Sequence, residues 1–223
     1  GTARLTASAR RDETGTTLRA LDLTAKSLVA SGKGKLSSLG NELTGQLSFA
    51  DLGDLDPGWG GGLTANASFA GTSADGTLML SGQGRRLSIG QPEVDRLIAG
   101  ETALDVVLKA KGGKFILAEA TLDGPNLTAE ARGSAGSDDL QVTGRIRDLA
   151  LLAPGYPGPV TLSGRLTPTV AGTSMDLRVL GPAAIDAQVA GSITGTNADL
   201  TLRGTADAAL LNALADPATL AGT

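Results

Sequence analysis

The chain contains an internal repeat, in which residues 122–164 have a second copy at residues 180–222. The offset between the copies is 58 residues, then 60, then 58, so the length differences fall in turns and not in strands. Internal periods of this size are typical of stacked supersecondary units, each unable to bury its apolar face alone. The sequence therefore predicts a repeat protein. The matching segments are LTAEARG (127–133) and IDAQVAG (185–191), DLQVTG (139–144) and DLTLRG (199–204), and VTLSG (160–164) and ATLAG (218–222).

Period-two alternation of apolar and polar residues is the main local signal. Leu5, Ala7 and Ala9, for example, alternate with Thr6 and Ser8. Such alternation is typical of strands with one apolar and one polar face. The predicted strands lie near residues 4–10, 21–25, 28–36, 41–49, 63–70, 76–82, 86–90, 102–110, 114–122, 127–133, 138–146, 160–167, 176–180, 184–191 and 198–204.

Short helical or turn segments interrupt this pattern at four places. They combine an early Asp or Pro with a terminal Pro or Gly, which are signals for the beginning and end of a helix. The interruptions are at 51–58, 92–100, 148–154 and 207–217.

About fifteen strands at ~4.8 Å spacing would make a sheet on the order of 70 Å long, which must twist and curl. We therefore expect one continuous all-β domain over residues 1–223, an elongated curled antiparallel sheet with a few short helical interruptions. The abrupt start at Gly1 and stop at Thr223 indicate a fragment of a longer chain.

The composition excludes several classes of function. The chain has no histidine and no cysteine, which removes disulfides, thiolate nucleophiles, Ser-His dyads and almost every transition-metal site. No serine or carboxylate is spaced with a plausible base, so we expect no enzyme, no cofactor and no metal. The net charge of −4 is spread over scattered residues, which argues against a nucleic-acid partner. No apolar run approaches the ~18–20 residues of a membrane-spanning helix.

No further helices or strands remain to cover the apolar face of the predicted sheet. The chain must fold the sheet on itself, dimerise, or keep the face for a ligand. A closed sandwich or a solid β-helix is one outcome, and alternation alone does not separate it from an open groove. Two open sheet edges would in addition favour self-association.

The pattern L-x-G-P-x-L-x-A-x-A-x-G at residues 122–133, the run GTADAALLNALADPATLAGT at residues 204–223 and the leucine- and alanine-rich strands resemble the TamB and AsmA-like family. TamB members are the translocation and assembly module subunits of Gram-negative envelopes. The resemblance covers essentially the whole chain and is clearest over residues 100–222.

The resemblance implies a U-shaped β-sheet (a β-taco) that is open along one side and lined with apolar side chains. It also implies a location in the periplasm of a Gram-negative bacterium, with the full-length protein anchored in the inner membrane. The implied partners are phospholipid or other acyl-chain cargo and a barrel-type outer-membrane assembly partner. The family's N-terminal anchor and its end domain for docking the barrel are not recognisable in these residues, so docking residues are left unassigned.

We therefore predict a segment of a periplasmic protein that bridges the two membranes, with an apolar groove for lipid transport, outer-membrane protein assembly, or both. The alternative is a secreted structural or adhesive β-solenoid with a closed core, whose usual rungs of about 20 residues are much shorter than this repeat. The predicted groove-lining residues are Leu104, Val106, Leu108, Ile116, Leu127, Leu140, Val142, Val160, Leu162, Ile185, Val189, Leu200 and Leu202.

Overall fold

The computed structural model describes residues 2–134, 138–195 and 197–207. Nearly all of these residues lie in antiparallel strands, as the alternating sequence predicts. The strands are β1 (Ala3–Asp12), β2 (Gly15–Ala25), β3 (Leu28–Ser37), β4 (Gly40–Phe49), β5 (Gly60–Gly71), β6 (Asp75–Ser88), β7 (Glu101–Lys111), β8 (Lys114–Asp123), β9 (Leu127–Gly133), β10 (Leu140–Ile146), β11 (Val160–Pro168), β12 (Thr173–Leu180), β13 (Asp186–Thr194) and β14 (Asn197–Thr205).

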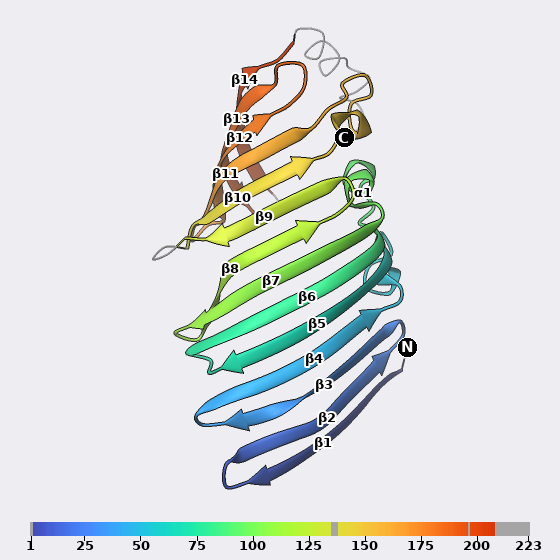
Figure 1. Ribbon diagram of the computed structural model, residues 1–223, viewed down its shortest axis with the longest axis vertical. Coiled ribbons are helices and arrows are strands. Elements are labelled where there is room, and N and C mark those ends of the chain that lie inside the picture. The colour runs from blue at the N-terminus through green and yellow to red at the C-terminus, as the bar shows by residue number, and fades with distance from the viewer. Residues whose placement is uncertain (1, 135–137, 196, 208–223) are drawn as a thin grey trace. The chain divides into compact units, whose positions relative to one another are not determined.

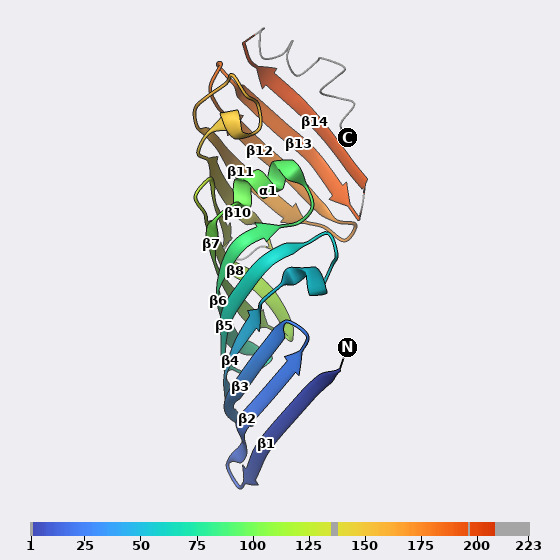
Figure 2. The same ribbon diagram turned by 90° about the vertical axis from the view of Figure 1, so that its right-hand side faces the viewer.

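The chain divides into two compact units, of which the first ends at Pro125 and the second begins at Asn126. Unit 1 contains β1–β8 and unit 2 contains β9–β14, and within each unit every strand pairs with its neighbours in sequence order (Figure 1). Within the described part of unit 1, β1 pairs with β2 alone, so this sheet is not closed into a barrel. In Figure 2 the long strands β5 and β6 bow along their length. The predicted all-β, curled antiparallel fold class is confirmed, and a single continuous domain stays a prediction.

The internal repeat is a pair of hairpins with the same register. Ala131 of β9 lies opposite Val142 of β10, and their counterparts Val189 and Leu202 lie opposite each other in β13 and β14. The second copy of the third matching segment, residues 218–222, lies outside the described residues. Over the described residues, therefore, the sequence repeat corresponds to a structural repeat.

Three of the four predicted interruptions are present as short helical segments. They are η1 (Leu52–Asp54), α1 (Pro92–Ile98) and η2 (Leu149–Leu151). The fourth, at residues 207–217, lies outside the described residues apart from residue 207. The two 3₁₀ turns begin in the same way, because Asp51 Oδ1 accepts from Gly53 N at 2.9 Å and Asp148 Oδ1 accepts from Ala150 N at 3.0 Å.

One predicted boundary between strands is wrong. The expected strands at 76–82 and 86–90 form a single strand, β6. A bulge in β6 absorbs the irregularity, because Arg86, with a φ of 52°, and Leu87 lie opposite the single residue Gly61 of β5. Because a bulge bends a strand without ending it, pairing continues to Ser88.

Candidate functional site

Cross-strand pairing joins the apolar residues of unit 1 into rows that cross the sheet. Directly paired residues of antiparallel strands share one face, so a row can be followed from strand to strand. We call this side of unit 1 the apolar face. Two of its rows contain neither a charged nor an aromatic residue: Leu5, Leu23, Ala30, Leu47, Ala65, Gly82, Leu104 and Leu122, and Ala7, Leu21, Gly32, Gly45, Ala67, Leu80, Val106 and Ala120.

Three of the four lining residues predicted in unit 1 lie on the apolar face. Leu104, Val106 and Leu108 occupy alternate positions of β7 and pair with Leu122, Ala120 and Leu117 of β8. Ile116 does not join them, because it pairs with Lys109 on the opposite face.

The misplacement of Ile116 is a correction with a local cause. The register of β7 and β8 shifts between Val107 and Leu108, so that β8 has one residue more than a regular ladder. A shift of one residue turns every later side chain to the other face. Phe115 and Leu117 therefore take the positions on the apolar face that the sequence pattern assigns to Ile116 and Ala118.

In unit 2, the register places eight of the nine predicted lining residues on one face. Ile185 precedes β13 and lies in a turn, where its side chain and that of Val160 both approach Gly181. The eight are Leu127, Leu140, Val142, Val160, Leu162, Val189, Leu200 and Leu202.

Away from the two ends of β7, these apolar faces have no second layer over them in the described residues. Ala110 and Val160 are the buried apolar side chains of that part of the chain. Leu104 remains 42% exposed and Leu202 71% exposed. Most other apolar side chains on these faces are half-buried, because they are covered only by one another.

The list of predicted residues omits much of the apolar face that the structure shows. Residues from β1 to β6 take part in the same rows and show the same alternation in the sequence. The main ones are Leu5, Leu21, Leu23, Leu43, Leu47, Phe69, Leu78 and Leu80.

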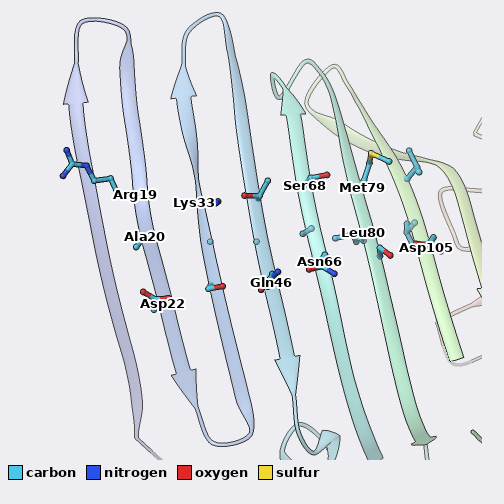
Figure 3. Close-up of a pocket in the computed structure, with 18 residues that line it drawn as sticks. Arg19, Ala20, Asp22, Lys33, Gln46, Asn66, Ser68, Met79, Leu80 and Asp105 are labelled. Atoms are coloured by element: carbon cyan, nitrogen blue, oxygen red, sulfur yellow. The ribbon is translucent and has the colours of Figure 1, made fainter. Parts of the chain in front are cut away.

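A hollow of about 680 Å³ lies on the opposite, polar face of unit 1 (Figure 3). Arg19 and Lys33 lie toward one end of it and Asp105 toward the other. A row of paired polar residues crosses it: Asp22, Ser31, Gln46, Asn66, Ser81 and Asp105. All six side chains are exposed, so this surface offers water-accessible hydrogen-bonding groups without a desolvated pocket.

The polar face of unit 2 carries a charged network around a second hollow of about 810 Å³. Arg178 binds Asp186 through two hydrogen bonds of 3.0 and 2.8 Å, and Gln188 donates to Asp176 at 2.7 Å. The Arg178 hydrogen bonds lower the pKa of Asp186. Because these groups are exposed, the ion pair of Arg178 and Asp186 adds little to the free energy of folding. Its main effect is to position β12 relative to β13.

Carboxylates anchor the helical connectors to neighbouring turns. Asp54 of η1 accepts from Ser27 N at 3.0 Å, and Asp95 of α1 accepts from Ile89 N at 2.7 Å. Asp148, before η2, accepts from Gly158 N at 2.9 Å as well as from Ala150 N. Hydrogen bonds from Ser27, Ile89 and Gly158, respectively, are the main causes that lower the pKa of the three carboxyl groups below the ordinary 3.8.

This lowered pKa predicts an acid-induced release of η1. The contribution of Asp54 is present above its ordinary pKa and is lost as the pH falls through the lower pKa of the folded state. Trp59, the chain's single tryptophan, follows η1 closely, so its fluorescence should change with a midpoint below pH 3.8. Asp54→Ala should remove that transition. A midpoint at or above pH 3.8, or an unchanged titration in the variant, would contradict this assignment.

The described residues contain no helix long and apolar enough to cross a membrane. Over the same residues, no group of three or more acidic, histidine or cysteine side chains is placed to hold a metal ion. Comparisons with protein-family models, curated proteins and solved structures found no match to this chain.

Proposed function

We propose that this chain is a lipid-conducting segment of a periplasmic protein that bridges the inner and outer membranes. Its apolar faces would hold the acyl chains of phospholipids while the headgroups stay in water. The observation that carries the proposal is an uncovered apolar face whose aliphatic rows continue from strand to strand, as in the row through Leu80 and Val106. Outer-membrane protein assembly with a barrel-type partner, and the periplasmic location, belong to the same proposal and are supported by the sequence resemblance.

The energetics of lipid transfer favour a surface of this kind. A two-chain phospholipid in water exposes ~30 methylenes at ~0.8 kcal/mol each, or about 25 kcal/mol in total. A continuous apolar surface removes most of that barrier, because the chains leave one apolar environment for another. The process needs no catalytic residue. Lipid transfer needs apolar side chains in register, on a face that is not filled by large aromatic rings.

The competing function, a structural repeat with a closed core, needs a second layer over these side chains. The described residues show half-buried side chains where a closed core would bury them, with Leu200 still 46% exposed. No observation favours the alternative over the open face.

The test is mass spectrometry of organic extracts from the chain purified without detergent. We expect phospholipid at near-stoichiometric amounts in the native chain, and its loss in the double variant Val142→Asp, Leu200→Asp. A matched control is Thr143→Asp, Thr201→Asp, which adds the same two charges to the same strands on the polar face.

The control should keep its lipid, because its carboxylates remain in water. Absence of lipid from the native chain, with unfolding of the apolar-face variant, would mean that these positions are a closed core. Loss of lipid from both double variants would mean that added charge alone, and not the apolar face, decides binding.

A further inference from the structure

The apolar face of unit 1 is covered at both ends of β7 and accessible between them. The residues of β7 that share this face alternate from Thr102 to Ala110. Thr102 is 4% exposed and Ala110 5% exposed, whereas Leu104 is 42% exposed. We call the part from Leu104 to Leu108 the apolar strip.

Two phenylalanine rings cover the end of the strip near Ala110. Phe69 of β5 and Phe115 of β8 meet edge to face, with ring centroids 6.2 Å apart and an interplanar angle of 76°. Their strands are separated by three strand spacings, or about 14 Å. The rings therefore meet only because they lean toward each other across β6 and β7 over a curled sheet. We call them the aromatic pair.

Small residues under the aromatic pair make this contact possible. A Cβ added to Gly76 would lie 2.8 Å from Cζ of Phe69, so that ring lies directly over the glycine. Ala110 is paired with Gly76 on one side and Phe115 on the other. Larger side chains at these two positions would hold the rings apart.

The helix α1 and Leu87 cover the other end of the strip. The Thr102 hydroxyl donates to the carbonyl oxygen of Ile98, the last residue of α1, at 3.3 Å. Gly84 is paired with Thr102, and a Cβ added to it would lie 2.4 Å from Cδ1 of Leu87. The strip is thus bounded at one end by the aromatic pair and at the other by Leu87 and α1.

We propose that the aromatic pair sets the width of the strip and so selects straight acyl chains over methyl-branched ones. This inference rests on the proposed function. The four residue steps from Leu104 to Leu108 span ~13 Å along β7, and chains in van der Waals contact need ~4–5 Å each. Two straight chains of one diacyl lipid take up ~8–10 Å of this width and therefore fit side by side. Methyl branches widen each chain, and the rings block the extra width.

In the experiment, the full chain is incubated with vesicles that contain equal amounts of dipalmitoyl- and diphytanoyl-phosphatidylglycerol. The two lipids share a headgroup and differ in chain width. After the vesicles are removed, mass spectrometry measures the ratio of the two lipids on the protein. We expect the native chain to enrich the straight-chain lipid at least ~5-fold, and Phe115→Ala to reduce this to under ~2-fold.

The test includes a check of folding and a control variant. Phe115 is 53% exposed, so its loss leaves the fold in place, which circular dichroism checks. Phe49→Ala is the matched control, because it removes the same side chain from the same face without touching the aromatic pair. An unchanged preference in Phe115→Ala, or an equal loss in Phe49→Ala, would overturn the inference and leave lipid binding intact. No lipid on the native chain would overturn the proposed function and this inference with it.

Discussion

Leu80→Asp is expected to lower the free energy of unfolding of the chain by ~3 kcal/mol at pH 7. Leu80 lies in the row between Ala67 and Val106, where it is half-buried among aliphatic side chains. The substitution removes apolar contacts and places a carboxylate among aliphatic side chains, where it is only partly hydrated. Urea denaturation followed by circular dichroism measures the loss.

The effect of Leu80→Asp should also depend on pH in a defined direction. Apolar surroundings raise the pKa of a carboxyl group, so the folded variant takes up its proton at a higher pH than the unfolded chain. The deficit relative to the native chain is therefore largest above the raised folded pKa. It shrinks as the pH falls toward the unfolded value of ~3.9.

The matched control for Leu80→Asp is Ser81→Asp, one position along the same strand. Ser81 is exposed on the polar face, between Asn66 and Asp105. The added carboxylate stays in water there, so we expect a change within ~0.5 kcal/mol. Equal losses of unfolding free energy in the two variants would show that β6 does not have one apolar and one water-exposed face.

Alternation in the sequence was sufficient to predict the strands and, mostly, their apolar faces. Val106 and Val142 lie where the period of two places them, because a regular ladder preserves that period across many strands. The repeat in the sequence likewise corresponds to two hairpins, β9–β10 and β13–β14, which the structure shows to have the same register. These features are local, and each can be read from one short segment.

Features that depend on the curvature of the sheet could not be predicted from the sequence pattern. The bulge that turns Ile116 to the polar face lies at a run of four apolar residues, 115–118, where the alternation is interrupted and does not fix which residues share a face. The contact of Phe69 with Phe115 joins residues that are distant in sequence and needs both the curl and the small residues between them. The hollow on the polar face could not be predicted either, since the pattern of its residues is that of an ordinary solvated face.

Gly164→Ala is expected to destabilise unit 2 by ~2–4 kcal/mol. A Cβ at this position would lie 2.1 Å from the carbonyl oxygen of Asp176 and 2.7 Å from Cα of Leu177, its partner on β12. Both contacts are with backbone atoms, so no side-chain rotation relieves them. The alanine must push β12 away from β11, which breaks ladder hydrogen bonds between the two strands.

Gly144→Ala is the matched control for Gly164→Ala, on the neighbouring strand β10 and the same face. Its new Cβ would meet its nearest atoms at 3.7–3.9 Å, which is ordinary van der Waals contact. We expect it to be neutral or to stabilise by up to ~1 kcal/mol, because alanine restricts the unfolded chain. Urea denaturation gives both free energies, and hydrogen exchange should show faster exchange in β11 and β12 for Gly164→Ala alone. Equal effects would contradict the close approach of β12 to Gly164, and with it the tight packing of these strands that lets the apolar rows of unit 2 continue from one strand to the next.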